Sequence, residues 1–362
     1  MAQRRANVDR LSNLRKKIDQ KITNYNREFV DSTKIKPGSG FNFIDLFGGA
    51  GGNSLGLVQA GFNPLLSVEI DHDASETYRM NFPSSQHFEG DVRDVSGGRI
   101  RDAVGDKTVH IIAAGFPCQG FSIAGNQEIM DTRNELYLEV IRFSKILKPW
   151  YVIMENVPGI INMAKGRFVD SIINDFDKTG YPGMSVSLLE SAAYGVPQIR
   201  PRAIFVANRF ELSNPYPKPI LSVEEYVPIE DAIGNLKDVE RNPESNHEWT
   251  LHTEKMEKRL ANVAPGRSLY ESYVDANKRQ YRNLPAMTIK ENHGTTHIHY
   301  ELNRTLSARE MARLQTFPDS FKFYGRMKRV MWQVGNAAPP LLFKHLGLSL
   351  LPNLDKIRKS LV

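Results

Sequence analysis

The sequence contains a single cysteine, Cys118, among its 362 residues. One thiol excludes a disulfide framework and every zinc site built from clustered cysteines. The chain also has no apolar run of about 18 residues, and its basic N-terminus lacks the apolar segment of a secretory signal. These absences predict a protein of the reducing cytoplasm that neither spans a membrane nor is secreted.

The length of 362 residues favours two domains of about 150 residues each, and 41% apolar residues suffice for a sizeable core. Charge is unevenly distributed along the chain. Lys and Arg exceed Asp and Glu in residues 1–40 and 241–330, whereas acids are in excess in 41–240. Solvated faces alone can produce such a distribution; the functional alternative is a basic surface for a polyanion beside an acidic catalytic half.

The only cysteine follows a short apolar run, Val109–Ala114, that is typical of a buried strand in a parallel sheet. Cys118 is therefore expected beyond the carboxyl end of a strand, where open α/β sheets bind ligands. A lone cysteine is more often a small buried apolar residue. Pro117 before it and Gln119 after it argue against burial here. A thiol with an ordinary pKa of about 8.5 needs nearby positive charge to act as a nucleophile at neutral pH.

Glycines follow the first predicted strand, over residues 41–47. Gly48–Gly52 and the helix after them form a strand–loop–helix unit, in which the backbone can approach a nucleotide at the helix N-terminus. The next strand, over 64–70, carries Glu69, placed about twenty residues after the glycines to hold ribose hydroxyls. Asp91 follows another such interval later. Together these features predict an adenosine-containing cofactor.

An acid and two arginines are predicted near the cysteine. The apolar run 151–156 is expected to form a buried strand, and Glu155 near its end would share an edge of the sheet with Cys118. A cap or a surface ion pair is the alternative role for this acid. Arg200 and Arg202 precede another apolar strand, and residues two apart on an extended chain share one face. They would supply the positive charge that the thiol requires.

Two terminal segments are predicted to be helical. Apolar residues recur every three or four positions within residues 1–38, which indicates one amphipathic helix that packs on the body of the protein and carries basic residues able to touch phosphate. Residues 134–147 have helical periodicity as well. The stretch 334–351 is expected to form a mostly apolar helix after Gly335-Asn336.

Residues 208–303 differ in character from the rest, because they are rich in Pro, Asn, His and charge and lack long periodic runs. Three histidines gather near the end of this segment: His293, His297 and His299. No cysteine or carboxylate pair completes a metal site with them, so a polar loop that touches nucleic acid or solvent is the favoured interpretation.

In order along the chain, these motifs resemble the motif set of the C5-cytosine DNA methyltransferases. The set comprises Asp45–Gly52, the strand ends at Glu69 and Asp91, Pro117–Gln119, Glu155–Val157, Gln198–Arg202, Arg309–Gln315 and Gly335–Pro340. It spans most of residues 41–207 and 301–345, and the order Pro-Cys, Glu-Asn-Val, Gln-x-Arg-x-Arg, Gly-Asn is highly specific. Gly48 departs mildly from the family, which more often has alanine or serine there; glycine is expected to cost only loop stiffness.

The resemblance implies an α/β fold, with a Rossmann-like S-adenosylmethionine-dependent methyltransferase domain and a second, smaller target-recognition domain. The expected division is a basic N-terminal helix (1–38), a catalytic and cofactor-binding domain (39–207), a target-recognition domain (208–329) and a returning segment that completes the catalytic domain (330–362). The implied reaction moves a methyl group from S-adenosylmethionine to C5 of a cytosine flipped out of duplex DNA, with S-adenosylhomocysteine as the other product.

The resemblance also implies roles for individual residues. The expected catalytic residues are Cys118 as nucleophile at C6, Glu155 at the N3 and amino edge of the base, Arg202 at its O2 side and Arg200 in support of the cysteine loop. Cofactor contacts are expected at Phe47, Gly49, Ala50, Gly51, Glu69, Ile70, Asp91, Val92, Pro117, Leu136 and Asn336. DNA contacts are expected at Gln119, Ser122 and Arg133, in a candidate closing loop. No metal is expected.

Three other classes of protein share parts of this pattern. A tRNA cytosine-5 methyltransferase of the same fold carries, in its family, an extra Cys-Phe-Thr signature that a chain with one cysteine cannot supply. An NAD-dependent dehydrogenase would share the glycine loop but leaves Pro117–Gln119 unexplained, and a non-catalytic DNA-binding regulator would need neither. The expected setting is a bacterial or phage modification enzyme, a monomer on DNA in the cytoplasm and nucleoid, with a cognate restriction endonuclease acting on the same site.

Overall fold

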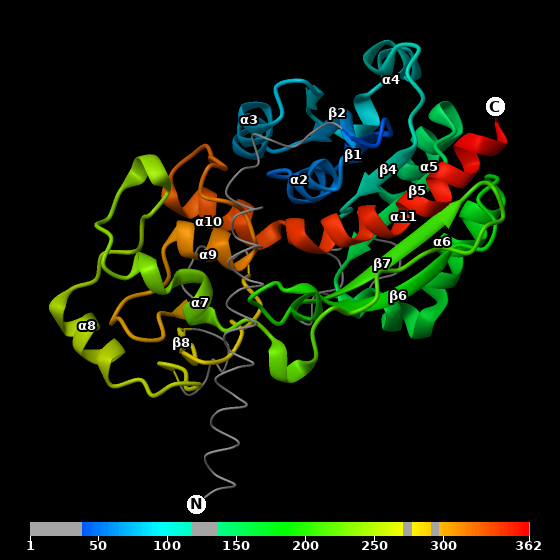
Figure 1. The fold of residues 1–362 in the computed structure, drawn as a ribbon. Coiled ribbons are helices and arrows are strands. Elements are labelled where there is room, and N and C mark those ends of the chain that lie inside the picture. Colours follow the sequence, from blue (N-terminus) through cyan, green and yellow to red (C-terminus); the bar gives the residue numbers. More distant parts are fainter. Residues whose placement is uncertain (1–37, 118–135, 271–276, 291–296, 362) are drawn as a thin grey trace, which may run out of the picture.

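A seven-stranded sheet forms the centre of the molecule (Figure 1). The computed structural model describes residues 38–117, 136–270, 277–290 and 297–361. The strand order is β3-β2-β1-β4-β5-β7-β6, in which β7 runs antiparallel to both neighbours and the other pairs are parallel. The strands are β1 (Asn42–Leu46), β2 (Asn63–Glu69), β3 (Gln86–Glu89), β4 (Ile111–Ala114), β5 (Tyr151–Asn156), β6 (Ser185–Glu190) and β7 (Pro201–Asn208). The α/β fold predicted from the sequence is confirmed.

The central strands of the sheet are apolar because both of their faces are covered. All four residues of β4 are buried, as expected for a short apolar run in a parallel sheet. Leu46 of β1 lies opposite Ala114 of β4, which in turn lies opposite Met154 of β5. The carboxyl ends of these three strands therefore meet at one edge, and the chain leaves β4 toward Cys118 at this edge.

Helices cover both faces of the sheet (Figure 1). One face packs against α4 (Gly97–Val104), α5 (Leu136–Leu147) and α6 (Arg167–Asp177), through a cluster that includes Ile112 and Val152. On the opposite face, α2 (Gly52–Gln59) and the long α11 (Pro340–Ser360) pack against each other and against Phe43 and Ile153. The last helix of the chain thus packs beside the first helix after the glycine loop.

The described residues between 208 and 329 form only short helices and strands, apart from short 3₁₀ turns. They are α7 (Ile229–Ile233), α8 (Glu254–Ala261), the paired strands β8 (Lys278–Arg279) and β9 (His297–Ile298), and α9 (Ala308–Leu314), followed by α10 (Met327–Asn336). The apolar cluster of α7, α9 and α10 also takes in Tyr78 and Phe82, at α3 (His72–Asn81) and its C-terminal cap. This segment therefore shares an apolar core with α3, which belongs to the part of the chain that forms the sheet. Its boundaries as a domain stay a prediction.

The mostly apolar helix expected after Gly335-Asn336 is confirmed as α11, which begins at Pro340 and continues to Ser360. Helix α10 ends at Asn336, Ala337 is extended, and α11 begins at Pro340. The break has a local cause, since Pro339 and Pro340 have no N–H to donate and a proline disfavours helical backbone in the residue before it. Among the described residues, no helix is both long enough and apolar enough to span a membrane.

Candidate active site

The glycine loop between β1 and α2 turns through backbone conformations that few residues adopt. Phe47, Gly49 and Gly51 have φ values of 59°, 52° and 94°. A Cβ on Gly51 would also lie 2.4 Å from the Phe82 ring, so glycine is required there by both conformation and space. The loop brings backbone N–H groups to the start of α2, as a nucleotide-binding loop does.

Glu69 braces this loop from the end of β2. Its Oε2 accepts a hydrogen bond from the Gly49 N–H at 2.7 Å, and its Oε1 accepts one from the Asp71 N–H at 2.8 Å. Burial raises the pKa of the Glu69 carboxyl above its ordinary value. Ile70 beside it is 68% exposed, which leaves an apolar side chain open at the same strand end.

Asp45, which the sequence indicated only as the first residue of a motif, lies buried beneath the glycine loop. Its carboxylate accepts hydrogen bonds from Ser54 Oγ at 2.7 Å and from Asn53 Nδ2 at 3.3 Å. Ser54 Oγ is in turn 2.9 Å from the Tyr78 hydroxyl. Burial raises the pKa of Asp45 to about 7. An acid inside an otherwise apolar strand was the signal that could have singled it out.

The remaining cofactor candidates differ in their surroundings. Arg93 holds both carboxylate oxygens of Asp91, with Nε–Oδ distances of 2.9 and 3.0 Å, and lowers the pKa of that acid. Val92 is buried in the core, and its carbonyl accepts from Arg142. Partly buried side chains are those of Phe47, Pro117 and Leu136; Asn336 is exposed at the end of α10, and Ala50 is buried.

Glu155 and Arg202 form an ion pair at the edge where β4 and β5 end and β7 begins. Glu155 Oε1 lies 2.6 Å from Arg202 Nε, and burial lowers the pKa of the arginine while Glu155 opposes that effect. A Cβ built on Gly115 would lie 3.6 Å from the other carboxylate oxygen of Glu155. The acid is thus next to the backbone that follows β4, three residues before Cys118.

Asn156, which had no assigned role, ties β5 to the same backbone. Its Nδ2 donates to the Phe116 carbonyl at 3.0 Å, and its Oδ1 accepts from the Val157 N–H at 2.8 Å. The side chain is buried, so both bonds are shielded from water. Asn156 therefore holds the backbone at Phe116, two residues before Cys118 in the chain.

Arg200 is 2% exposed and is surrounded by carbonyl groups. It donates to the Ile289 carbonyl at 2.6 Å and to the Gly335 and Ala337 carbonyls at 2.8 and 2.9 Å. Burial lowers the pKa of this guanidinium well below its ordinary value. Arg200 therefore joins the start of β7 to residues 289 and 335–337, segments far apart in the sequence.

Several of the predicted site residues lie outside the described residues. They are Cys118, Gln119, Ser122 and Arg133; the same holds for the N-terminal helix expected over 1–38, of which only residue 38 is described. Their predicted roles stay predictions. The described part of the site consists of the glycine loop, the ends of β2, β4 and β5, and the start of β7.

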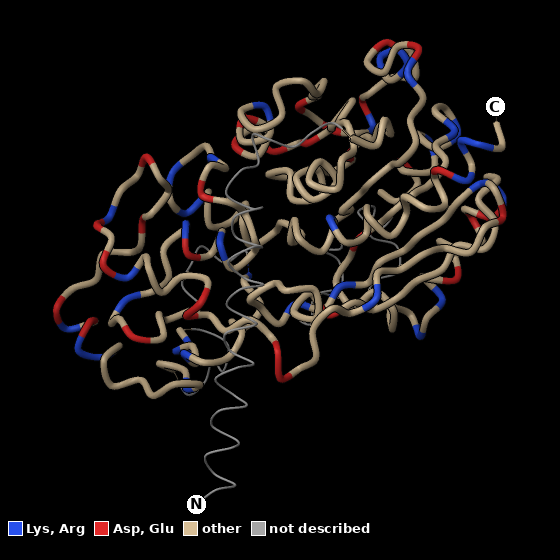
Figure 2. Tube along the Cα trace, viewed as in Figure 1, with Lys and Arg blue, Asp and Glu red and all other residues tan. Residues whose placement is uncertain are grey.

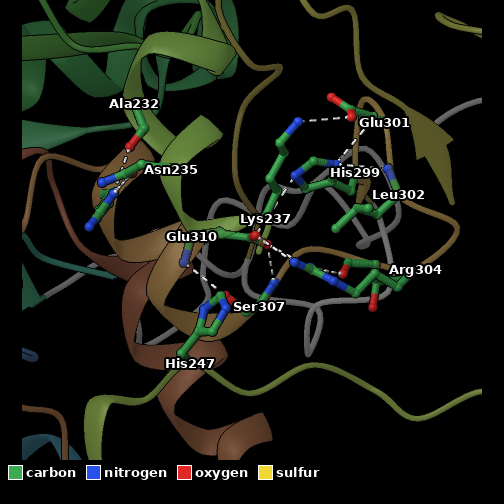
Figure 3. Close-up of polar contacts among 12 residues, drawn as sticks. Ala232, Asn235, Lys237, His247, His299, Glu301, Leu302, Arg304, Ser307 and Glu310 are labelled. Atoms are coloured by element: carbon green, nitrogen blue, oxygen red, sulfur yellow. Dashed lines mark hydrogen bonds and ion pairs between the residues drawn. The ribbon is translucent and has the colours of Figure 1, made fainter. Parts of the chain in front are cut away.

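A buried polar cluster organises the segment before α9 (Figure 3). Arg304 forms two hydrogen bonds with Glu310, at 2.7 and 2.8 Å, and Ser307 Oγ lies 2.9 Å from His247 Nδ1. His299 Nδ1 accepts from the Glu301 and Leu302 N–H groups, at 3.0 Å each. These contacts join His247 to Ser307 and hold residues 299–310 together inside the protein.

The expectation that the histidines form a polar loop touching nucleic acid or solvent was wrong for His297 and His299. Both are buried, at 3% and 0% exposure, and burial lowers the pKa of His299 to about 4. Backbone N–H groups that bond a histidine ring leave no mark in the sequence. His293 lies outside the described residues.

The positive charge of residues 241–330 is only partly at the surface. Figure 2 shows Lys and Arg interspersed with Asp and Glu over this part of the molecule. Three arginines are buried and bonded inside it, Arg279 and Arg309 to backbone carbonyls and Arg304 to Glu310. The charge excess read from the sequence thus overstates the basic surface available to a polyanion.

Comparison with known proteins identifies the family. The family model described as C-5 cytosine-specific DNA methylase matches residues 41–351. Type II methyltransferase M1.HphI of Haemophilus parahaemolyticus is 36% identical over 324 residues, 85% of this chain and 86% of that protein. Type II methyltransferase M.Eco47II of Escherichia coli is 35% identical over 370 residues, 95% of this chain and 86% of that protein.

Solved structures agree with this assignment. A putative DNA modification methyltransferase encoded within an E. coli prophage has a TM-score of 0.74 and 27% identity, covering 87% of this chain and 99% of that chain. The sequence and structural matches together show that this chain belongs to the C-5 cytosine-specific DNA methylase family and is a DNA cytosine-5 methyltransferase.

Proposed function

We propose that this enzyme methylates cytosine in duplex DNA through a covalent bond between Cys118 and C6 of the base. C5 of cytosine is too weak a nucleophile to take a methyl group unaided. The Cys118 thiolate adds to C6, and the electron pair of the C5–C6 double bond moves into the ring so that C5 becomes nucleophilic. C5 takes the methyl group, with S-adenosylhomocysteine as the leaving group. A general base then accepts the C5 proton, the C5–H bonding pair restores the C5–C6 double bond, and the sulfur–C6 bond breaks with its electron pair returning to the thiolate.

The observation that carries this proposal is the Glu155–Arg202 ion pair at 2.6 Å beside Gly115. It sets an acid and a fixed cation next to the chain that leads to the nucleophile. In this assignment Glu155 bonds N3 and the amino group of the base as charge develops there, and Arg202 bonds O2. Groups held in advance stabilise that charge without reorganising during the reaction.

Arg200 is assigned a supporting role. Its bonds to the carbonyls of Ile289, Gly335 and Ala337 hold the start of β7, two residues before Arg202. In this proposal it keeps the loop around Cys118 and the base-contacting Arg202 in register. It acts through its neighbours rather than on the base.

The residues at the glycine loop fit S-adenosylmethionine, which supplies the methyl group when bound. Each Glu69 oxygen accepts one described backbone hydrogen bond and retains a lone pair for a ribose hydroxyl. Exposed Ile70 offers an apolar surface to the adenine ring, and Phe47 lies at the start of the loop. An Asp91 contact with adenine requires Arg93 to release one of the carboxylate oxygens.

The other site residues complete this assignment by analogy with the family. Gly49, Ala50, Gly51, Val92, Pro117, Leu136 and Asn336 are proposed to line the cofactor site. Gln119, Ser122 and Arg133 are proposed to contact DNA, in a loop that closes over a flipped base, since C5 and C6 are inaccessible in a stacked pair. Residues 208–329 are proposed to read the target sequence.

The proposed substrate is double-stranded DNA rather than tRNA. The similar proteins M1.HphI and M.Eco47II are named Type II methyltransferases. We therefore propose that a cognate restriction endonuclease acts on the same sequence, and that the methyltransferase works as a monomer on DNA in the bacterial cytoplasm and nucleoid.

The covalent step is tested with a DNA duplex in which 5-fluorocytosine replaces cytosine. Fluorine cannot leave C5 as a proton does, so the reaction should stop after methylation with protein and DNA linked through sulfur. The purified enzyme, the duplex and S-adenosylmethionine should give a complex that survives a denaturing gel. Cys118→Ser should abolish it, because the hydroxyl has a far higher pKa than a thiol.

Two controls complete the experiment. Unsubstituted DNA should give no stable complex, and omission of S-adenosylmethionine should prevent its irreversible accumulation. No second cysteine exists in the sequence to replace Cys118. A complex that persists in Cys118→Ser would refute the covalent role of this residue.

A further inference from the structure

We propose that Arg329 is a positioning residue for the methyl-donor site, because it fixes the segment that holds the Glu69 carboxylate. Arg329 lies on α10, outside the glycine loop and far from it in sequence. The inference rests on the proposed function of Glu69 as the acid that holds the ribose of S-adenosylmethionine. It assigns a role in donor binding to Arg329, a residue of α10 that lies outside the motifs read from the sequence.

Two nitrogens of the Arg329 guanidinium form ion pairs with acids at the start of α3. Its Nη2 forms an ion pair with Asp71 Oδ2, and its Nε lies 2.7 Å from Asp73 Oδ2. The guanidinium also packs over the Trp332 ring, 4.6 Å from the ring centroid, which restricts its orientation. One cation thus pairs with two acids that closely follow Glu69 in the chain.

Asp71 connects Arg329 to the donor site through its own backbone. Its backbone N–H donates to Glu69 Oε1 at 2.8 Å, and the other Glu69 oxygen accepts from the Gly49 N–H at 2.7 Å. The Asp71 side chain also accepts from the Ala74 N–H at 3.0 Å and so caps α3. A continuous series of bonds therefore joins Arg329 to the glycine loop through Asp71 and Glu69.

A second contact keeps α10 against α3 when Arg329 is replaced. Gln333 lies one turn after Arg329 on α10, and its Oε1 accepts from Thr77 Oγ1 at 2.6 Å. The Tyr324 N–H donates to the same threonine oxygen at 2.8 Å. Tyr78 of α3 and Val330 and Met331 of α10 also belong to one apolar cluster. Loss of the Arg329 guanidinium should therefore change the local charge without separating the two helices.

The charges that face Glu69 make the effect of Arg329 measurable. Asp71 raises the pKa of the Glu69 carboxyl in addition to the larger effect of burial, and Asp45 on β1 is the other acid coupled to it. Arg329 and Asp73 lie on the far side of Asp71. Without Arg329, the charge of Asp71 is no longer neutralised and should raise the pKa of Glu69 further.

The test is calorimetric titration of S-adenosylmethionine into three proteins at pH 6.5 and pH 8.5: the wild type, Arg329→Met and the double variant Arg329→Met with Asp71→Asn. The single variant should bind about tenfold more weakly at pH 6.5 and should lose less affinity at pH 8.5, because a higher pH favours the ionised Glu69 carboxylate. The double variant should regain most of the affinity, because the uncompensated charge is gone while the backbone N–H and a capping side chain remain.

Arg329→Lys keeps the positive charge but cannot pair with Asp71 and Asp73 through two separate nitrogens. The pH dependence of its affinity for S-adenosylmethionine should therefore resemble that of the wild type. Lys258→Met is the matched control, since it removes an exposed ion pair with Glu254 on α8. Equal affinities of wild type and Arg329→Met at both pH values, or no recovery in the double variant, would overturn the role of Arg329. A wild type that fails to bind S-adenosylmethionine would instead refute the proposed cofactor.

Discussion

Glu155 on β5 and Arg202 on β7 are held 2.6 Å apart by the antiparallel pairing of their strands. Both side chains are largely buried, so neither charge is well solvated by water. The pair acts as one unit, because removal of one partner would leave an uncompensated buried charge. Arg202 is therefore not a free cation available to a thiolate, because Glu155 already holds its Nε.

Glu155→Gln should slow formation of the 5-fluorocytosine complex by about 10²- to 10⁴-fold, the usual effect of losing a positioned acid. Glutamine can still accept a hydrogen bond from Arg202 Nε, so the geometry is retained while the charge is lost. The measurement is single-turnover complex formation on denaturing gels, with DNA binding followed separately. Glu139→Gln on α5 makes the same change outside the site, next to Arg142. A Glu155→Gln enzyme as fast as the wild type would contradict the assignment.

Glu69→Ala should weaken S-adenosylmethionine binding by about ten- to a hundredfold, because it removes the proposed ribose acceptor and the brace of the Gly49 N–H. The charged carboxylate is the better acceptor and its pKa is raised, so wild-type affinity should fall as pH drops through that raised pKa. Titration calorimetry measures both effects. Glu89→Ala on neighbouring β3 is the control, since Arg79 and His72 already bond that acid. Undiminished affinity in Glu69→Ala, or tight NAD binding by the wild type, would reject the cofactor assignment.

Asp45→Asn should change how stability depends on pH. The folded pKa of Asp45, about 7, exceeds its ordinary value of 3.8, so the folded state binds a proton that the unfolded state has lost. This group therefore lowers stability progressively as pH rises from about 4 to about 7, by up to about 4 kcal/mol. Urea unfolding from pH 4 to pH 8.5 should show a decline in the wild type that the Asp45→Asn variant lacks. Parallel stability curves for the two proteins would count against a buried titrating acid.

Gly48→Ala should destabilise the fold, although the sequence led us to expect that glycine at this position costs only loop stiffness. A Cβ at Gly48 would lie 2.4 Å from Ser67 Oγ, so alanine should destabilise the fold by about 1–3 kcal/mol unless the serine moves. Adding Ser67→Ala removes the obstructing hydroxyl and should restore most of the loss. Denaturant unfolding of both single variants and the double variant gives the coupling. Simple additivity of the two changes would show that the contact does not limit residue 48.

The sheet could be predicted because its central strands are short apolar runs in the sequence. Residues 111–114 and 151–156 are buried on both faces, and such strands contrast sharply with their polar and glycine-rich surroundings. Glu155 could be placed at a strand end for the same reason. The helix after Gly335-Asn336 was predicted from its apolar residues, whereas α10 before it was not predicted.

The partners of buried charges were not predictable. Arg200 bonds backbone carbonyls at Ile289 and Gly335, and backbone atoms carry no residue-specific signal in the sequence. The pairing of Arg329 with Asp71 depends on how α10 packs on α3, a contact between residues far apart in the chain. The same long-range packing buries His299, which reads as polar loop when taken alone.

Bisulfite sequencing of DNA from cells that express the chain tests the central claim most directly, because 5-methylcytosine resists conversion. The wild type should protect cytosine at one defined sequence context, and Cys118→Ser, expressed at the same level, should leave every cytosine convertible. DNA from cells without the gene gives the background. Full conversion with the wild type, or equal protection by Cys118→Ser, would contradict a DNA cytosine-5 methyltransferase that acts through this thiol.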